Sequence, residues 1–368
     1  MMAQTPRWPD WLPLNQRLQL LSPYGAPQIE NVVALNTNEN PFDLPVEVVE
    51  VMTRRIAEIL PHLNRYPDRD AIELRKALER YLSGQVRTVD ISHKQIFAAN
   101  GSNEILQTLA LSFGDRGAIG FLPSYSMHPL IAQGVGIQWS SGTRAQDFSL
   151  DVDIAIREIN EVKPSLIFIT TPNNPTGHPV TISEIEKLAA IAKEVNALLV
   201  VDEAYAEFST LPSAITLIDK YPNIVVVRTM SKAFSLAGAR LGYLYAREEV
   251  IDGLMLTRLP YHLSSQTQAI AQAALESEKI LLSQVEYLIS QREAVANSLR
   301  KMGFFVHPSA ANFLLFSGFS VEPQTVWRGV LEAGVLIRDV GIAGHLRVTI
   351  GTQAENEQFL AAIQSFAP

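Results

Sequence analysis

The segment 165–205 reads SLIFITTPNNPTGHPVTISEIEKLAAIAKEVNALLVVDEAY. Its two ends, Ser165–Thr170 and Ala197–Val201, are continuous apolar runs rich in β-branched residues, which is typical of strands buried on both faces of a parallel sheet. Between them, Ser183 and Glu186 form a capping-box pattern, and the apolar residues that follow keep the helical period. The segment therefore predicts two sheet strands joined by a helix that shields one face of the sheet.

The same alternation of strands and helices continues on both sides of this segment. Five further apolar runs also have the length and composition of strands. With the two strands above, they predict a mainly parallel sheet of seven strands flanked by helices. The five runs are Gln95–Ala99, Gly117–Phe121, Ile137–Ser140, Asn223–Arg228 and Arg240–Tyr245.

After Leu263 the pattern changes to a smaller α+β unit that is built separately from the large sheet. It begins with two helices, 266–276 and 278–302, and Gly303 closes the second one. Strands at 313–316, 335–338 and 346–350 and helices at 324–332 and 354–366 follow. The expected divisions of this α/β fold are 1–40 (N-terminal arm and small-domain segment), 41–263 (large domain) and 264–368 (small domain).

The composition excludes several classes of protein. The 368 residues include 38 acidic and 30 basic side chains, a formal charge of −8, so the chain lacks the basic surface of a nucleic-acid-binding protein. It has no cysteine, which excludes disulfides and a cysteine nucleophile, and its seven histidines show no metal-binding spacing. Because there is no signal-peptide pattern and no apolar run of membrane-spanning length, we expect a cytoplasmic location without membrane contact.

Polar side chains follow several of the predicted strands, at the edge where ligands of open α/β sheets bind. The turn 100–104 opens a helix at Ser102 and Asn103, whose N–H groups could bind a phosphate, although an ordinary strand–turn–helix connection explains it too. The turn 171–177 holds Asn174 at the sheet edge, either as a ligand-binding amide or simply as a turn former.

Two further strand ends carry groups that react or pair with charges. Asp202 ends an apolar strand, where a buried carboxylate is costly unless a cation meets it, and Tyr205 follows three residues later. Lys232 follows a core strand and lies eight residues before Arg240. Most lysines are solvated surface groups, but a lysine among small residues and hydroxyls can have a lowered pKa and form imines.

The strand ends thus supply an amine, a carboxylate, an amide, a phenol, a phosphate site and a guanidinium group, which is the set that pyridoxal phosphate requires. With these motifs in order, the sequence resembles the fold-type I pyridoxal-phosphate aminotransferases over nearly the whole chain. Within them it is most similar to the histidinol-phosphate aminotransferase branch. The segments that carry this second resemblance are LNTNENPF (35–42), RYPD (65–68), DEAYAEF (202–208) and LRVTIG (346–351).

The resemblance implies an aspartate-aminotransferase-like fold, pyridoxal phosphate as the cofactor and no metal. Lys232 would bind the cofactor aldehyde covalently and then move the proton during catalysis. Asp202 would pair with the pyridine nitrogen, Asn174 and Tyr205 would hydrogen-bond the phenolic oxygen, and Tyr125 would stack on the ring. The cofactor phosphate would be held by Ser102, Asn103, Thr229, Ser231 and Arg240. The usual residue at position 103 is Asp, so its local charge differs here.

The resemblance also implies a homodimer, because Tyr66 would reach the phosphate in the neighbouring subunit's site. Arg347 would bind the substrate carboxylate, together with Asn174. Arg338 would contact a further anionic group, with Tyr24 from the N-terminal arm. Alternatively, Arg338 and Arg347 are two surface arginines of a strand-rich unit, or Arg338 simply pairs with Asp339.

The expected reaction is transamination of histidinol phosphate with 2-oxoglutarate in histidine biosynthesis, which gives imidazole acetol phosphate and glutamate. Its substrates would be a phosphorylated amine and a 2-oxo acid. An aromatic amino acid aminotransferase and a pyridoxal-phosphate-dependent decarboxylase of a phosphorylated amino acid are the alternatives within this chemistry. A non-catalytic pyridoxal-binding module is disfavoured, because Lys232, Asp202 and Arg347 are all present.

Overall fold

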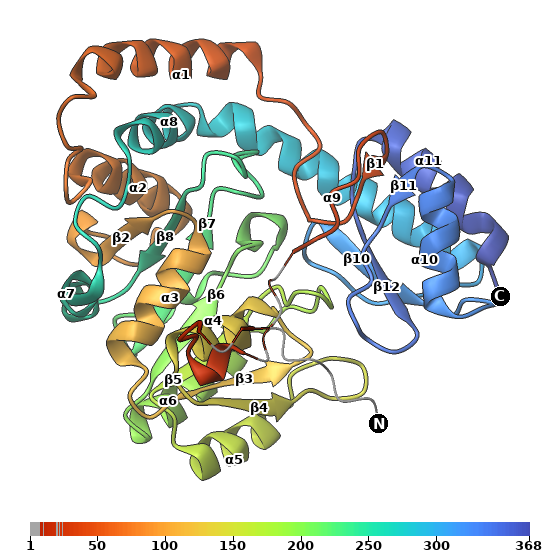
Figure 1. Ribbon diagram of the computed structural model, residues 1–368, viewed down its shortest axis with the longest axis horizontal. Helices are drawn as coiled ribbons and strands as arrows, with labels where there is room; N and C mark the ends of the chain where they lie inside the picture. The colour runs from red at the N-terminus through yellow and green to blue at the C-terminus, as the bar shows by residue number, and fades with distance from the viewer. Residues whose placement is uncertain (1–7, 10, 20, 22, 24) are drawn as a thin grey trace.

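A seven-stranded sheet forms the centre of the larger part of the molecule, as predicted (Figure 1). The computed structural model describes residues 8–9, 11–19, 21, 23 and 25–368. The sheet order is β2-β8-β7-β6-β5-β3-β4, and β8 alone runs antiparallel to its neighbours. The strands are β2 (Ile96–Ala99), β3 (Ala118–Leu122), β4 (Trp139–Thr143), β5 (Leu166–Thr170), β6 (Leu198–Asp202), β7 (Ile224–Thr229) and β8 (Gly242–Tyr245).

Helices cover both faces of this sheet, which is why its strands are apolar on both sides. In β7, Val225 and Val227 pack in one cluster with residues of α3 and α7. Ile224 and Val226 alternate with them and pack in the other cluster, with residues of α2, α5 and α6. The helices of this part are α1 (Val46–Ile59), α2 (Ile72–Gln85), α3 (Ser102–Phe113), α4 (Met127–Val135), α5 (Val152–Val162), α6 (Ile182–Glu194) and α7 (Glu248–Thr257).

The smaller part lies beside the sheet, to the right in Figure 1. Its antiparallel sheet has the order β12-β10-β9. β1 and β11 pair in parallel in a separate two-stranded sheet, so residues of the predicted arm contribute a strand to the smaller part. α8 packs against α1 and α2. The elements are β1 (Val33–Ala34), α8 (Ser265–Glu276), α9 (Glu278–Lys301), β9 (Phe305–Val306), β10 (Phe313–Ser317), α10 (Pro323–Glu332), β11 (Val335–Leu336), β12 (His345–Thr349) and α11 (Gln353–Ile363). The three predicted domain boundaries stay predictions.

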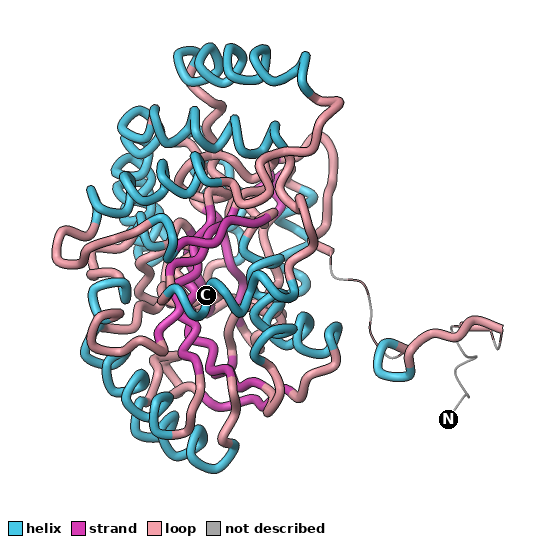
Figure 2. The backbone as a smooth tube through the Cα atoms, turned by 90° about the vertical axis from the view of Figure 1, so that its left-hand side faces the viewer, coloured by secondary structure: helices cyan, strands magenta, loops and turns pink. Residues whose placement is uncertain are grey.

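The N-terminal segment leaves the body of the molecule at one side (Figure 2). Its short 3₁₀ helix η1 (Gln16–Leu18) contacts α4, and Arg17 donates a hydrogen bond to the carbonyl oxygen of Gly134 (3.3 Å). Among the described helices, none is both long enough and apolar enough to cross a membrane.

The start of α6 differs from the prediction. Thr181 is the N-cap residue, and its side chain and that of Glu184 form the capping box, two residues before the predicted pair. Both positions fit the Ser/Thr-x-x-Glu pattern, so the pattern alone cannot choose between them. The backbone N–H of Val180 donates to the Thr171 hydroxyl (2.8 Å), which keeps the chain extended up to Val180 and lets the helix begin directly after it.

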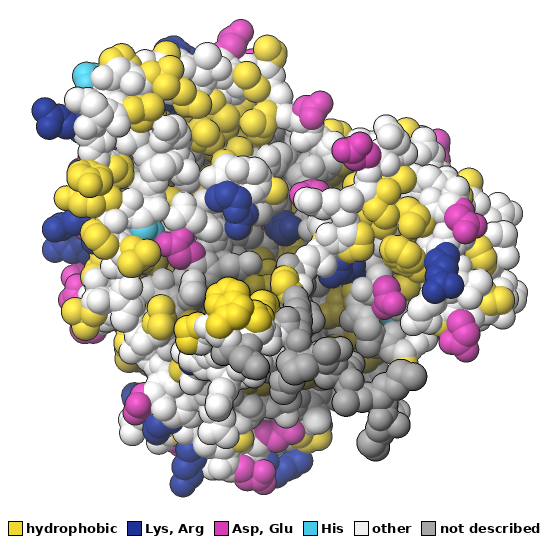
Figure 3. Space-filling view, viewed as in Figure 1, with side chains coloured by type: hydrophobic (Ala, Val, Ile, Leu, Met, Phe, Trp, Pro, Cys, Tyr) yellow, Lys and Arg dark blue, Asp and Glu magenta, His cyan; other side chains and the backbone are white. Residues whose placement is uncertain are grey.

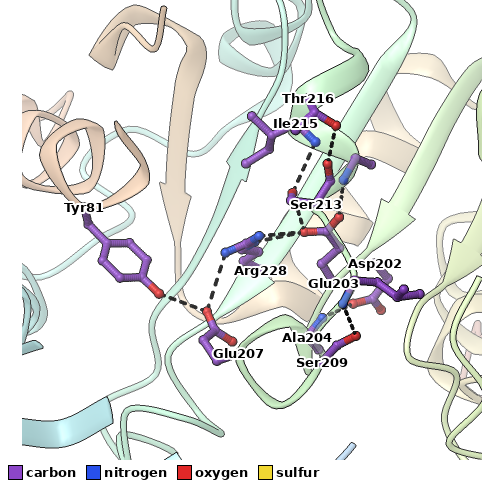
Figure 4. A network of polar contacts seen from close by, with 12 residues as sticks. Tyr81, Asp202, Glu203, Ala204, Glu207, Ser209, Ser213, Ile215, Thr216 and Arg228 are labelled. Carbon is purple, nitrogen blue, oxygen red and sulfur yellow. Dashed lines mark hydrogen bonds and ion pairs between the residues drawn. The ribbon is translucent and has the colours of Figure 1, made fainter. Parts of the chain in front are cut away.

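A buried network of charged groups joins the ends of β6 and β7 on the face opposite to Asp202 (Figure 4). Arg228 donates to Glu203 Oε2 from Nε (3.0 Å) and Nη2 (2.8 Å), and its Nη1 lies 3.6 Å from Glu207 Oε1. The Tyr81 hydroxyl donates to the same oxygen of Glu207 (3.2 Å). Because these side chains are nearly inaccessible, each carboxylate depends on Arg228 to compensate its lost hydration.

We therefore predict that Arg228→Met lowers the free energy of unfolding of the apoprotein by about 3 kcal/mol, since it leaves buried carboxylates uncompensated. Urea denaturation measures this loss. The matched control is Arg55→Met, which breaks the partly exposed ion pair with Glu276 and should cost less than about 1 kcal/mol. Equal losses for the two variants would contradict the structural role of the Arg228 network.

Candidate active site

A cavity of about 630 Å³ lies between the ends of the large sheet's strands and the smaller part of the molecule. In the space-filling view, Lys and Arg side chains are visible in the hollow between the two parts (Figure 3). Twelve of the fourteen predicted site residues line this cavity. They are Ser102, Asn103, Tyr125, Asn174, Asp202, Tyr205, Thr229, Ser231, Lys232, Arg240, Arg338 and Arg347.

The alternation of side chains along parallel strands explains why residues from three strands meet here. Thr170 at the end of β5 pairs in register with Asp202 at the end of β6. Asp202 in turn pairs with Val227, two residues before Thr229 in β7. Side chains two positions apart in a strand share a face, so Thr170, Asp202 and Thr229 all point to the face that α3 and α4 cover.

Asp202 lies at the floor of the cavity and is 2% exposed. Its Oδ2 is 3.2 Å from Nε2 of His128 on α4, and its Oδ1 accepts a hydrogen bond from the N–H of Ala204 (3.2 Å). The His128 ring is stacked on Phe168, with centroids 4.9 Å apart. The carboxylate is thus held in a fixed orientation inside the protein, which suits a group that must pair with one positive charge.

A second group of residues forms an anion-binding site at the start of α3. Gly101 precedes the helix at a φ of +85°, and a Cβ atom there would lie 2.4 Å from Nη2 of Arg240. Glycine therefore lets the guanidinium group approach the N–H groups of the first helical turn. The hydroxyls of Thr229 and Ser231 are hydrogen-bonded to each other (3.0 Å), and Arg240 Nη1 lies 3.4 Å from the Ser231 hydroxyl.

The amine of Lys232 lies in the same cavity and donates to the backbone carbonyl of Thr37 (2.9 Å). Burial, together with the positive charges of Arg347 and Arg240, lowers the pKa of Lys232 to about 8, and Glu39 acts in the opposite direction. About a tenth of the amine is therefore uncharged, and so nucleophilic, at pH 7, which is far more than for an ordinary lysine.

The two predicted substrate-binding arginines are neighbours across an antiparallel bridge. The N–H of each donates to the carbonyl oxygen of the other (2.9 Å both ways), so Arg338 and Arg347 are a directly opposed pair whose side chains share one face. Arg347 also donates to Asn174 Oδ1 and to the carbonyl oxygen of Asn36 (both 2.6 Å), and its guanidinium group lies over the Phe313 ring.

Two predicted site residues do not lie in the cavity. Tyr66 is 79% exposed and stacks on Tyr261, with ring centroids 4.4 Å apart, so it makes no contribution to the site of its own chain. Its predicted contact with a neighbouring subunit stays a prediction. Tyr24 lies outside the described residues.

Sequence reasoning missed His128 and the segment 36–38. His128 was set aside with the other single histidines, and its position three residues after Tyr125 is the only signal that could have linked it to the site. Residues 36–38 belong to a motif that supported the family resemblance, but the motif gave no role to them. In the structure all three line the cavity and contact Lys232, Tyr205 or Arg347.

These groups fit pyridoxal phosphate. A dianionic phosphate matches the N-terminus of α3 with its adjacent hydroxyls and Arg240. A protonated ring nitrogen matches the buried carboxylate of Asp202, and an aldehyde matches the partly neutral amine of Lys232. Gly101 in particular leaves the space beside Arg240 free of a side chain of its own.

The chain belongs to the aminotransferase class I and II family, whose model matches residues 30–363. Enzymes of this family use pyridoxal phosphate, and this chain is accordingly a pyridoxal-phosphate-dependent aminotransferase. Among curated proteins it is similar to the histidinol-phosphate aminotransferase of Mycolicibacterium smegmatis. The two are 51% identical over 354 residues, which are 95% of this chain and 92% of the relative.

Solved structures share the fold. The histidinol-phosphate aminotransferase from Sinorhizobium meliloti in complex with pyridoxal-5'-phosphate has a TM-score of 0.81 at 23% identity and covers 99% of this chain and 98% of its own. A double mutant of Thermus thermophilus aspartate aminotransferase has a TM-score of 0.82 at 22% identity and covers 96% and 99%. The predicted aspartate-aminotransferase-like fold is confirmed.

The lowered pKa of Lys232 makes a prediction about cofactor attachment. Only the neutral amine attacks an aldehyde, so the rate at which the apoprotein binds pyridoxal phosphate covalently should rise to about pH 8 and level off above it. Stopped-flow absorbance at a series of pH values measures this rate. In Arg347→Met, which removes a nearby positive charge, the midpoint should move to higher pH. A wild-type rate that keeps climbing to about pH 10, the range of an ordinary lysine, would contradict the assignment.

Proposed function

We propose that this chain transfers the amino group of histidinol phosphate to 2-oxoglutarate, giving imidazole acetol phosphate and glutamate in histidine biosynthesis. The observation that carries the proposal is the opposed pair Arg338 and Arg347, which line the same cavity as Lys232. Guanidinium groups match the geometry of both phosphate and carboxylate, so one pair can serve a phosphate ester in one half-reaction and glutamate in the other. The similarity to the Mycolicibacterium enzyme, which is named for this activity, supports the same substrate.

In this proposal the chain's own residues divide the work. Pyridoxal phosphate, when bound, supplies an aldehyde and an electron-withdrawing ring. The Nζ atom of Lys232 would hold that aldehyde and, once the substrate amine has displaced it, would carry the proton that leaves the substrate carbon. Asp202, oriented by His128, keeps the ring nitrogen protonated. Asn174 and Tyr205, which are hydrogen-bonded to each other (3.4 Å), serve the phenolic oxygen.

The direct test is to incubate purified holoenzyme with histidinol phosphate and 2-oxoglutarate and to measure glutamate. Formation of glutamate would support the proposal, and a reaction without glutamate would contradict it. Phenylalanine turning over faster than histidinol phosphate would favour an aromatic aminotransferase instead. Release of carbon dioxide from a phosphorylated amino acid would favour a decarboxylase.

The arginine pair makes a prediction about substrate preference. Arg338→Met should lower kcat/KM for histidinol phosphate by about 100-fold, because a charge-assisted contact to the phosphate is lost, and should change it by less than about threefold for phenylalanine. Steady-state kinetics with both donors measure the difference. Arg328→Met removes an exposed arginine of α10 and serves as the control. Equal losses for both donors in Arg338→Met would show that Arg338 does not bind the phosphate.

We also propose that the chain works as a homodimer in which Tyr66 completes the partner's phosphate site. Tyr66 is exposed and stacks on Tyr261, and large apolar side chains close to these two residues in the sequence are also exposed, which supports an interface there. These side chains are Leu60 (54%), Leu63 (43%), Leu256 (86%) and Leu259 (74%), and Tyr261 itself is 41% exposed. Apolar groups of this size are usually covered when they gather on a surface.

A shared site predicts complementation between two defective chains. Lys232→Ala lacks the amine in its own cavity, and Tyr66→Ala lacks the side chain that it would give to its partner. A mixed dimer contains one complete site, so unfolding and refolding the two variants together should restore about a quarter of the wild-type activity. Each variant alone is the control. Activity of the mixture that equals the sum of the separate variants would contradict the shared site.

A further inference from the structure

Asn38 is a buried residue of the segment 36–38 that connects the two parts of the molecule. It is 1% exposed and has a φ of +58°, a left-handed conformation that Asn adopts more readily than most residues. On one side it contacts Tyr205, which follows β6 of the large sheet. On the other side it contacts Thr349 of β12 and Asn312, which precedes β10, both in the smaller part.

Every polar group of Asn38 takes part in a hydrogen bond. Its backbone N–H donates to the Thr349 hydroxyl (3.0 Å), and its carbonyl oxygen accepts from Asn312 Nδ2 (3.1 Å). The Thr349 hydroxyl donates to Asn38 Oδ1 (3.0 Å), and Asn38 Nδ2 donates to the Tyr205 hydroxyl (2.9 Å). Because all of its own polar groups are paired, Asn38 is held in one arrangement.

Thr349 stabilises the orientation that the Asn38 amide has in the structure. Its hydroxyl oxygen already accepts the backbone N–H of Asn38, so the hydroxyl proton is available for the side-chain oxygen. This places Oδ1 toward Thr349 and therefore Nδ2 toward Tyr205.

The second amide at Tyr205 is oriented in the same way. Arg347 lies two residues before Thr349 on β12, can only donate, and points at Asn174 Oδ1 (2.6 Å). Asn174 Nδ2 is thereby turned toward the Tyr205 hydroxyl at 3.4 Å, a longer contact than that of Asn38. Thr349 and Arg347 of β12 thus orient two amide side chains, and the N–H groups of both amides donate to the hydroxyl oxygen of Tyr205.

We propose that Asn38 is a positioning residue for the transamination: held by Thr349, it keeps Tyr205 a hydrogen-bond donor toward the group bound in the cavity. Two amide donors occupy the lone pairs of the Tyr205 oxygen, so the hydroxyl proton is directed away from both amides. The Asn38 contact does not depend on Arg347, so it persists when Arg347 turns to a substrate anion. The inference rests on the proposed function only in that Tyr205 faces the bound cofactor.

The experiment is a pH titration of the visible absorption of substrate-free holoenzyme. When the Tyr205 hydroxyl donates to the phenolic oxygen of the cofactor, it stabilises the anionic form of that oxygen. This lowers the pKa of the Lys232-linked chromophore. Asn38→Asp replaces the donor with an acceptor and should raise this pKa by about one unit. Thr349→Val leaves Tyr205 and the charges around it unchanged but releases the Asn38 amide. It should raise the pKa in the same direction by about half a unit and lower kcat more than KM.

Thr349→Ser keeps the hydroxyl and is the matched control, with a pKa expected within about 0.2 units of the wild type. The charged groups near the amine, which are Arg347, Arg240 and Glu39, are the same in both Thr349 variants. A purely structural role would lower thermal stability in Thr349→Val without moving the chromophore pKa.

Wild-type titration curves in both Asn38→Asp and Thr349→Val, with the cofactor still bound, would overturn the proposal. If Asn38→Asp does not fold, the comparison of Thr349→Val with Thr349→Ser decides alone. Because the titration contains no substrate, a wrong assignment of histidinol phosphate leaves its outcome intact. A wild-type holoenzyme without a visible band would instead contradict the cofactor chemistry itself.

Discussion

The site depends on the interaction between a buried amine and two guanidinium groups in the same cavity. Burial disfavours the charged form of Lys232, and so do the charges of Arg347, which would bind an anionic substrate, and Arg240, which would bind the cofactor phosphate. One arrangement therefore does two things: it attracts anions and keeps an amine reactive. The backbone carbonyl of Thr37 holds the amine in place without adding a full negative charge that would reverse the effect.

The large sheet and most of the site could be predicted from the sequence, because both follow from local patterns. Apolar runs of strand length indicated the seven strands, and parallel strands must end at a common edge. Polar residues directly after such runs, as at Asp202 and Lys232, were therefore expected to meet, and they do. The capping box at α6 was placed two residues late, since two overlapping patterns satisfied the same rule. The run 137–140 was placed too early for β4, the strand predicted at 335–338 is shorter as β11, and the short strands β1 and β9 were missed.

Contacts between distant segments could not be predicted in this way. Asn38 reaches Tyr205 and Thr349 across separations of 167 and 311 residues, and His128 reaches Asp202 across 74. No periodicity or turn signal encodes such pairs, because they depend on how the smaller part packs against the large sheet. The predicted role of Tyr66 cannot be tested in a single chain, since its predicted partner site belongs to another subunit.

The most direct test of this account is to reduce the holoenzyme with borohydride and to locate the cofactor adduct by peptide mass spectrometry. The account predicts one pyridoxyl adduct per chain, on Lys232, and none on the exposed lysines such as Lys76 and Lys220. An adduct on another lysine, or a colourless protein that traps none, would contradict the assignment of Lys232 as the reacting amine.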